Sequence, residues 1–298
     1  MNAWEPVTAA QIDTAEPTFE IRQPPADAPP TPLVFASPHS GRVYPAEMMA
    51  ASALDAGTIR RSEDAFVDDL IGHAPDHGAA VLLARLARAY IDVNREPYEL
   101  DQAMFEDELP DFARGRTARV AAGLGSIARI VSEGQEIYAR KLTFEEARGR
   151  IDTVHRPYHD ALSRLLAAAR GRHGMAVLVD WHSMPSAAAD HARPGKGCDM
   201  VLGDRFGAAC SPVLTRLVEQ ELEAMGYRTV RNAPYAGGFT TEHYGRPAKR
   251  THALQIEINR ALYLNEETME PTDGLERLTG DLERLTRALA AMDWAKLR

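Results

Sequence analysis

The sequence has few cysteines, no long apolar run and no excess of positive charge. Only two of its 298 residues, Cys198 and Cys210, are cysteine, which excludes a disulfide framework and a thiolate-rich metal site. No apolar run approaches the roughly 18 residues that a transmembrane helix needs. The formal net charge of −9 argues against nucleic-acid binding that relies on neutralising phosphates. A catalytic metal ion would therefore need histidine and carboxylate ligands.

The first 32 residues differ in composition from the rest of the chain. They are polar and rich in proline, and their acidic beginning does not match a secretory signal. We interpret residues 1–32 as an extended arm. The remainder has no internal repeat and no second linker, so residues 33–298 are predicted to form a single domain.

Short apolar runs alternate with longer amphipathic segments in residues 33–298. Strands are predicted at 33–37, 80–83, 90–93, 176–179 and 254–258, with weaker signals at 201–202 and 227–230. Helices are predicted at 46–54, 63–73, 143–170, 211–225 and 273–292. Ser62 is a candidate N-cap, Thr143 and Glu146 form a capping box, and Pro157 should kink or split its helix. Strands that alternate with helices predict an α/β fold with a largely parallel, buried sheet.

Ionisable side chains gather where these predicted strands end. His39 follows the first strand, Asp180 and His182 follow the strand at 176–179, and Glu257 lies within the last strand. The segment DVNR closes the strand at 90–93. Ligands of open α/β sheets bind beyond the carboxyl ends of the strands, so these segments predict one functional site.

His39 and His182 are the candidate metal pair. Either histidine alone would be read as a hydrogen-bonded loop residue, but two at strand ends beside a buried carboxylate favour metal binding. Glu257 is flanked by isoleucines, and a buried carboxylate needs a partner or a raised pKa. It is either a general base or the partner of Arg260 or Arg95.

Two further segments are candidates for substrate contact. Asn94 and Arg95 could bind a carboxylate, although Asp92 or Asp101 could equally pair with Arg95. The segment PYAGGFTTEHYGRP could form a wall or lid of the site, or an ordinary tight turn; its candidate residues are Gly237, Gly238, Thr240, His243 and Arg246. The HRPYH segment lacks the glutamate of a metalloprotease helix and is assigned to helix packing.

Eight motifs in order along residues 33–265 resemble the N-formylglutamate amidohydrolase (deformylase) family. They are SPHSGRVYP, RRSEDAFVDDL, YIDVNREP, HRPYHDAL, VDWHSMPS, CDMVLGDRFG, GGFTTEHYGRP and LQIEINRALYL. The resemblance implies metal-dependent hydrolysis of N-formyl-L-glutamate to formate and L-glutamate, a step of histidine degradation. It also implies a fold similar to the zinc carboxypeptidases, with helices around a mixed central sheet.

The resemblance also implies roles for single residues. His39 and His182 look like metal ligands, Asn94 and Arg95 like a carboxylate-binding pair, and Glu257 like the catalytic glutamate. The sequence has Arg42 where the carboxypeptidases have a glutamate ligand. The third ligand is therefore expected from the SED segment, with Asp64 preferred and Glu63 as the fallback. The expected metal is Zn²⁺, although such ligands also accept other divalent ions.

The mechanism expected from these assignments is attack by an activated water. Glu257 would act as its general base, and Arg95 or Arg260 would help to stabilise the oxyanion. Arg246 or Arg260 would hold the second carboxylate of a small anionic N-acyl amino acid. The chain is expected to act in the cytoplasm as a monomer or homodimer, without nucleic-acid or membrane partners. Another N-acyl-amino-acid deacylase, a carboxypeptidase-like enzyme and a non-catalytic binding relative are the alternatives.

Overall fold

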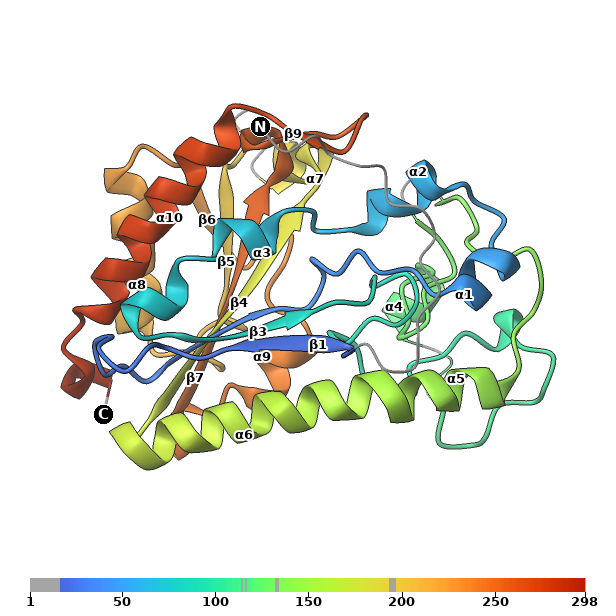
Figure 1. Ribbon diagram of the computed structural model, residues 1–298, viewed down its shortest axis with the longest axis horizontal. Helices are drawn as coiled ribbons and strands as arrows, with labels where there is room; N and C mark the ends of the chain where they lie inside the picture. The colour runs from blue at the N-terminus through green and yellow to red at the C-terminus, as the bar shows by residue number, and fades with distance from the viewer. Residues whose placement is uncertain (1–16, 114, 116, 132–133, 193–196, 298) are drawn as a thin grey trace. The chain divides into compact units, whose positions relative to one another are not determined.

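A computed structural model describes residues 17–113, 115, 117–131, 134–192 and 197–297 (Figure 1). The contacts within the chain divide it into two compact units. The first unit comprises Met1–Phe19, Gly41–Glu63 and Ala84–Tyr158, and the second comprises Glu20–Ser40, Asp64–Leu83 and His159–Arg298. The extent of the predicted arm, residues 1–32, stays a prediction, because residues 1–16 lie outside the described part of the chain.

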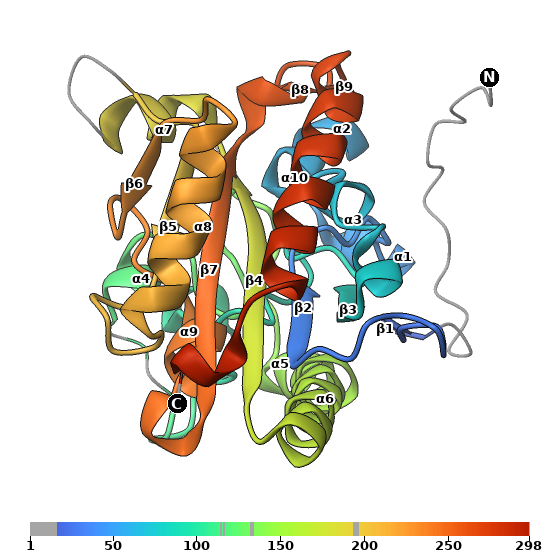
Figure 2. The ribbon, with the colours of Figure 1, turned by 90° about the vertical axis from the view of Figure 1, so that its left-hand side faces the viewer.

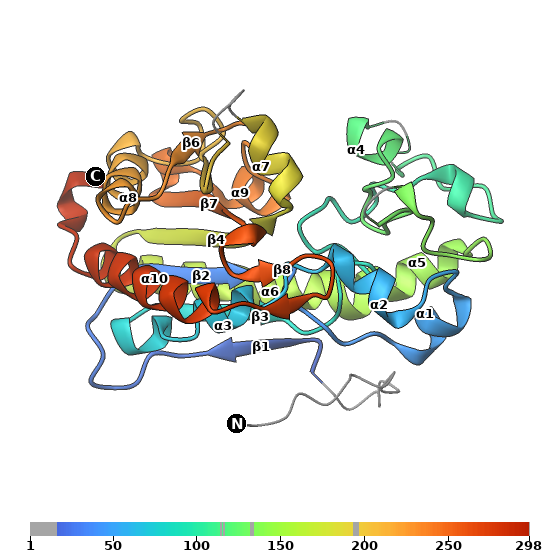
Figure 3. The same cartoon turned by 90° about the horizontal axis from the view of Figure 1, so that it is seen from above.

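The second unit is built around a seven-stranded sheet, with β1 at one edge and β6 at the other (Figure 3). Strands β2, β3 and β4 pair in parallel, as do β4 with β7 and β5 with β6, whereas β5 runs antiparallel to β7. The prediction of an α/β fold with a mixed central sheet and flanking helices is therefore confirmed. The strands, in sheet order, are β1 (Phe19–Arg22), β3 (Ala80–Ala84), β2 (Leu33–Ser37), β4 (Ala176–Met184), β7 (Thr251–Asn259), β5 (Met200–Gly203) and β6 (Thr229–Arg231).

Helices α3 (Val67–Leu70), α8 (Pro212–Ala224) and α10 (Gly274–Ala290) pack on one face of this sheet, where Figure 2 shows α8 and α10. Their apolar side chains form one core with alternate strand residues, among them Val179 and Trp181 of β4 and Ile256 of β7. Successive residues of a strand point to opposite faces. The residues between them, which include Asp180, His182, Gln255 and Glu257, therefore face the other side of the sheet.

The predicted long helix at 143–170 forms as α5 (Phe144–Arg150) and α6 (Arg156–His173), joined by a π-helical turn at Ile151–His155. The Thr143–Glu146 capping box is confirmed. Pro157 does not split the helix. Proline has no N–H for the preceding turn, and the π-helical turn that comes before it adjusts the backbone hydrogen bonding there.

Two predicted elements are wrong. Residues 90–93 form no strand, because the Asp92 side chain accepts a hydrogen bond from the Asn94 N–H (2.8 Å) and turns the chain. The predicted helix at 63–73 is reduced to α3, and Ser62 ends a 3-10 turn instead of capping a helix. There the Asp64 N–H donates to the His39 carbonyl (3.0 Å), which holds Asp64 in a loop.

The remaining elements are short. They are the helices α1 (Ala46–Ala51), α2 (Ala56–Ile59), α4 (Ala118–Ala121), α7 (Ser186–Ala192) and α9 (Phe239–Tyr244), the strands β8 (Leu264–Asn265) and β9 (Glu270–Pro271), and the 3-10 helices Arg60–Ser62, Ala74–His77, Gln102–Met104, Pro247–Lys249, Arg260–Leu262 and Trp294–Leu297. None of the described helices is long and apolar enough to cross a membrane.

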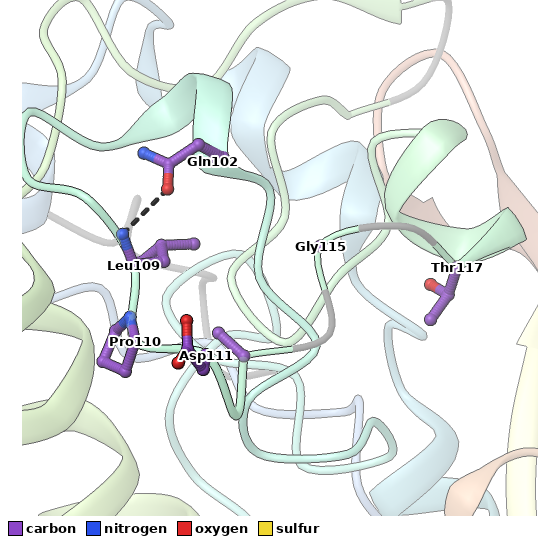
Figure 4. A pocket seen from close by; sticks show the side chains of 7 residues that line it. Gln102, Leu109, Pro110, Asp111, Gly115 and Thr117 are labelled. Atoms are coloured by element: carbon purple, nitrogen blue, oxygen red, sulfur yellow. Dashed lines mark hydrogen bonds between the residues drawn. The ribbon is translucent and has the colours of Figure 1, made fainter.

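The first unit contains two small apolar cores, one around Met48 and Ile137 and one around Leu100 and Phe105. It also has a cavity of about 550 Å³ lined in part by Gln102, whose amide bridges backbone groups of its loop (Figure 4). None of the candidate site residues lines this cavity.

Candidate metal and catalytic site

Three candidate ligands, His39, Asp64 and His182, converge in the second unit. The Nδ1 atoms of the two histidines lie 3.0 Å apart, and Asp64 Oδ2 lies 3.3 Å from His39 Nδ1 and 3.2 Å from His182 Nδ1. His39 follows β2 in a turn where Ser37 Oγ donates to Ser40 Oγ (2.9 Å). Three side chains from three segments thus meet at one point, as the sequence predicted.

The geometry and chemistry of this group fit a metal ion. A tetrahedral Zn²⁺ site with bonds of about 2.0–2.1 Å has ligand–ligand edges of about 3.3 Å, close to the three distances found. All three side chains are buried. Two ring nitrogens and a carboxylate oxygen present lone pairs to the same point, which is unfavourable without a shared cation or proton. The donor set suits zinc and also other divalent ions.

Asp180 lies behind the candidate ligand His182. Its Oδ2 is 3.1 Å from His182 Nε2, and its side chain is fully buried. Burial opposes charge on His182, but the Asp180, Asp64 and Glu257 carboxylates outweigh it and raise the pKa of His182 well above its ordinary value. A carboxylate behind a histidine ligand also fixes the ring so that the other nitrogen faces the metal.

Arg260 holds the other oxygen of Asp64. Its Nη2 donates to Asp64 Oδ1 (3.0 Å), and its Nε donates to Ser183 Oγ (3.1 Å). From the sequence, Arg260 is expected to take part in substrate binding or in oxyanion stabilisation, and this stays a prediction. In the structure Arg260 contacts a candidate ligand, which leaves Asp64 Oδ2 directed at the histidines.

Glu257 lies beside the ligand group on the same face of the sheet. Strands β4 and β7 pair in parallel with Glu257 opposite His182, and Glu257 is 7% exposed. Gln255 Nε2 donates to Glu257 Oε1 (2.8 Å), and Gln255 Oε1 accepts from the Gly238 N–H (2.7 Å). A largely buried carboxylate next to a metal site can act as a general base.

The loop before α9 approaches this face through its backbone. Gly237 has φ +116°, and a Cβ there would lie 2.9 Å from the Thr241 side chain, so the loop requires glycine at this position. Thr240 is fully buried at the start of α9. His243 is exposed and stacks on Phe239, with ring centroids 5.1 Å apart.

Arg246 lies at the end of this segment, away from Glu257 along β7. It forms an isolated β-bridge with Thr251, the first residue of β7, and its guanidinium donates to the carbonyls of Glu242 in α9 and of Gly245, which follows α9. Glu257 lies six positions along β7 from Thr251, a distance of about 20 Å. This position does not favour the predicted contact of Arg246 with a substrate at the ligand group.

Glu63, the fallback ligand, belongs to the first unit and has other partners there. Tyr44 Oη donates to Glu63 Oε1 (2.8 Å), and Arg60 Nε donates to the same oxygen (3.2 Å). Burial raises the pKa of Glu63 despite the nearby Arg60. Among the described residues, the group that could hold a metal contains Asp64 and not Glu63.

Asn94 and Arg95 also belong to the first unit. The partly buried guanidinium of Arg95 donates to the carbonyls of Leu124 (3.0 Å) and Asn94 (2.9 Å), and it lies 3.9 Å from Asp92. Burial lowers the pKa of Arg95. The alternative partner Asp101 pairs with Arg129 instead, at 3.1 Å.

The two histidines of the HRPYH segment each form a hydrogen bond with a neighbouring residue. His155 Nε2 lies 2.9 Å from the Arg95 carbonyl, and His159 Nδ1 lies 3.0 Å from Tyr244 Oη.

Sequence reasoning did not assign roles to Asp180, Ser183 or Gln255. The signal for two of them was the alternation of a strand: Asp180 shares a face with His182, and Gln255 shares one with Glu257. Ser183 has no such signal, because its contact with Arg260 joins two distant segments.

Comparisons with known proteins point to one family. The family model of N-formylglutamate amidohydrolase matches residues 31–264. An N-formylglutamate deformylase of Pseudomonas putida is 33% identical over 243 residues, which is 79% of this chain and 82% of that protein. A second N-formylglutamate deformylase, from Pseudomonas aeruginosa, is 29% identical and covers 79% and 83%.

Solved structures show the same fold. An N-formylglutamate amidohydrolase from Ralstonia eutropha JMP134 is 38% identical, with a TM-score of 0.86 over 92% of this chain and 97% of that one. A gene product of Agrobacterium tumefaciens, 17% identical, has a TM-score of 0.57 over 94% of this chain and 98% of that one, and is similar in fold alone.

Proposed function

Since the chain belongs to the N-formylglutamate amidohydrolase family, we propose that it hydrolyses N-formyl-L-glutamate to formate and L-glutamate with the help of a divalent metal ion. The observation that carries this proposal is the buried group of His39, Asp64 and His182 with Glu257 beside it, within the segment that the family model covers. The names of the two Pseudomonas relatives support the substrate. A place in histidine degradation is part of the proposal.

His39, Asp64 and His182 would hold the ion, with Zn²⁺ as the proposed metal. When bound, such an ion lowers the pKa of water and polarises a carbonyl oxygen. Two neighbouring side chains hold the ligands in place. Asp180 faces the rear nitrogen of His182 at 3.1 Å, and Arg260 takes up Asp64 Oδ1 at 3.0 Å, so that Oδ2 remains on the side of the histidines.

Glu257 moves the proton in this proposal. It takes the proton from the water that attacks the formyl carbon and passes it to the nitrogen of glutamate as the C–N bond breaks. The products are formate and a free amino group. The position of Glu257 supports this role, because it is largely buried and is paired across the strands with His182.

The two substrate carboxylates need cationic or hydrogen-bonding partners. From the family resemblance we propose that Arg95 and Asn94 bind one of them. The loop of Gly237, Gly238 and Thr240 is proposed as a wall of the substrate site, because the Gly238 backbone is connected through Gln255 to Glu257. An additional role of Arg95 in stabilising the oxyanion belongs to the same proposal.

A substrate panel tests this function. Purified protein loaded with one equivalent of Zn²⁺ would be given N-formyl-L-glutamate, N-acetyl-L-glutamate and a glutamyl dipeptide, with formate or free amine measured. The proposal predicts the highest kcat/KM for the formyl substrate. A preference for the acetyl or dipeptide substrate would indicate another N-acyl-amino-acid deacylase or a carboxypeptidase-like enzyme. Binding without turnover would indicate a non-catalytic relative.

A further inference from the structure

Gln255 connects the proposed base to the glycine loop through two hydrogen bonds. It lies in β7 two residues before Glu257, so both side chains point to the same face of the sheet. Its side chain is buried, at 3% exposure. Its Nε2 lies 2.8 Å from Glu257 Oε1, and its Oε1 lies 2.7 Å from the Gly238 nitrogen.

The chemistry of these partners fixes the orientation of the Gln255 amide. The backbone N–H of Gly238 can only donate, so the amide oxygen of Gln255 must face it. The amide NH₂ group then faces Glu257 and donates to Oε1. Gln255 thus meets Oε1 as a donor. In a protonated carboxyl group the carbonyl oxygen is the better acceptor, so a donor to Oε1 favours the form in which the accepted proton is on the second oxygen, Oε2.

We propose that Gln255 is a positioning residue that selects the carboxylate oxygen with which Glu257 accepts a proton. The inference deepens the proposed function and rests on it, because it assumes that Glu257 is the base. The Gly238 backbone anchors Gln255, and Gln255 orients Glu257 next to the strand position of His182. The loop before α9 thereby helps to set the direction of the base.

Two substitutions of Gln255 separate positioning from anchoring. Gln255→Glu keeps an acceptor for the Gly238 N–H but loses the donor to Glu257, whereas Gln255→Met loses both. Positioning predicts that both variants lower kcat by roughly 10- to 100-fold, the scale of one hydrogen bond to a charged group. It also predicts that KM and bound zinc change little.

Gln102→Glu provides the matched control. Gln102 has the same pattern of bonds, because its Oε1 accepts from the Leu109 N–H (2.8 Å) and its Nε2 donates to the Asp107 carbonyl (2.8 Å). Gln102 is not among the residues proposed to bind the metal ion, the substrate or the proton. This variant should therefore retain the wild-type kcat. If Gln255→Glu also retains it, only anchoring of the loop matters and the proposal is overturned.

A double-mutant cycle completes the test. Gln255→Met should have little effect in a Glu257→Gln background, because the group that it positions is no longer a base. An equal loss of kcat in both backgrounds would show a general structural role and would contradict the proposal. Absence of formate release by the wild-type protein would instead refute the proposed function itself, so the two failures are distinguishable.

Discussion

Replacing Asp180 with asparagine tests how the proposed ligand His182 is held. Asp180 is fully buried with its Oδ2 3.1 Å from His182 Nε2, so its charge favours a ring proton on Nε2 and a lone pair on Nδ1, the nitrogen that lies near His39 and Asp64. Asparagine has nearly the same volume but no charge, and its NH₂ group can face the ring and favour the wrong tautomer. The substitution therefore changes the orientation and basicity of the ligand without opening a cavity.

The expected loss of metal affinity is about 10- to 100-fold, the usual range for a partner behind a metal ligand, or about 1.4–2.7 kcal/mol. Competition between the protein and a chelator at fixed pH measures this loss as a change in Kd for Zn²⁺. Asp152→Asn is the control, because it removes the same charge from an exposed pair with Arg156. A Kd for Asp180→Asn within twofold of the wild-type value would refute the role of Asp180.

The other predictions concern the base, the substrate and stability. Glu257→Gln should keep stoichiometric zinc by elemental analysis and lower kcat by about 10²–10⁴-fold; near-normal turnover would remove Glu257 from the mechanism. Arg95→Lys should raise KM by about 10-fold, since it loses a bidentate contact with a substrate carboxylate, and should lower kcat as well, since it weakens the proposed stabilisation of the oxyanion; an unchanged KM would exclude the carboxylate-binding role. The hydrogen bond from Arg140 lowers the pKa of Glu146 to about 2 from 4.5, so its ionised form contributes stability above pH 4.5 that is lost as the pH falls towards 2. The difference in Tm between wild type and Glu146→Gln should shrink over that range, and a constant difference would contradict this assignment.

The alternation of apolar and polar residues made the sheet and its site predictable. Buried strands read as apolar runs, and a glutamate or histidine that interrupts such a run stands out, as Glu257 and His182 do. His182 proved to lie inside β4 rather than beyond it, because the strand continues to Met184. A strand retains its alternation wherever it ends, so Asp180 and His182 share one face of the sheet although the predicted strand was too short.

Contacts between distant segments were not predictable from these patterns. Asp64 and Glu63 are adjacent carboxylates, and sequence alone left both as possible ligands. In the structure the two residues have different partners. The Asp64 N–H donates to the His39 carbonyl, whereas the Glu63 side chain accepts a hydrogen bond from Tyr44. The contact of Arg260 with Asp64 joins residues 196 positions apart. Such pairings depend on the order of the strands, which local patterns do not specify.

We propose that His39, Asp64 and His182 bind the metal ion on which formate release depends. The most direct measurement is the rate of formate release from N-formyl-L-glutamate by metal-stripped protein as Zn²⁺ is added back. The wild-type rate should rise from near zero and saturate at one equivalent, whereas Asp64→Ala should not recover at that concentration. A metal-stripped wild-type protein that hydrolyses the substrate at its full rate would contradict the claim.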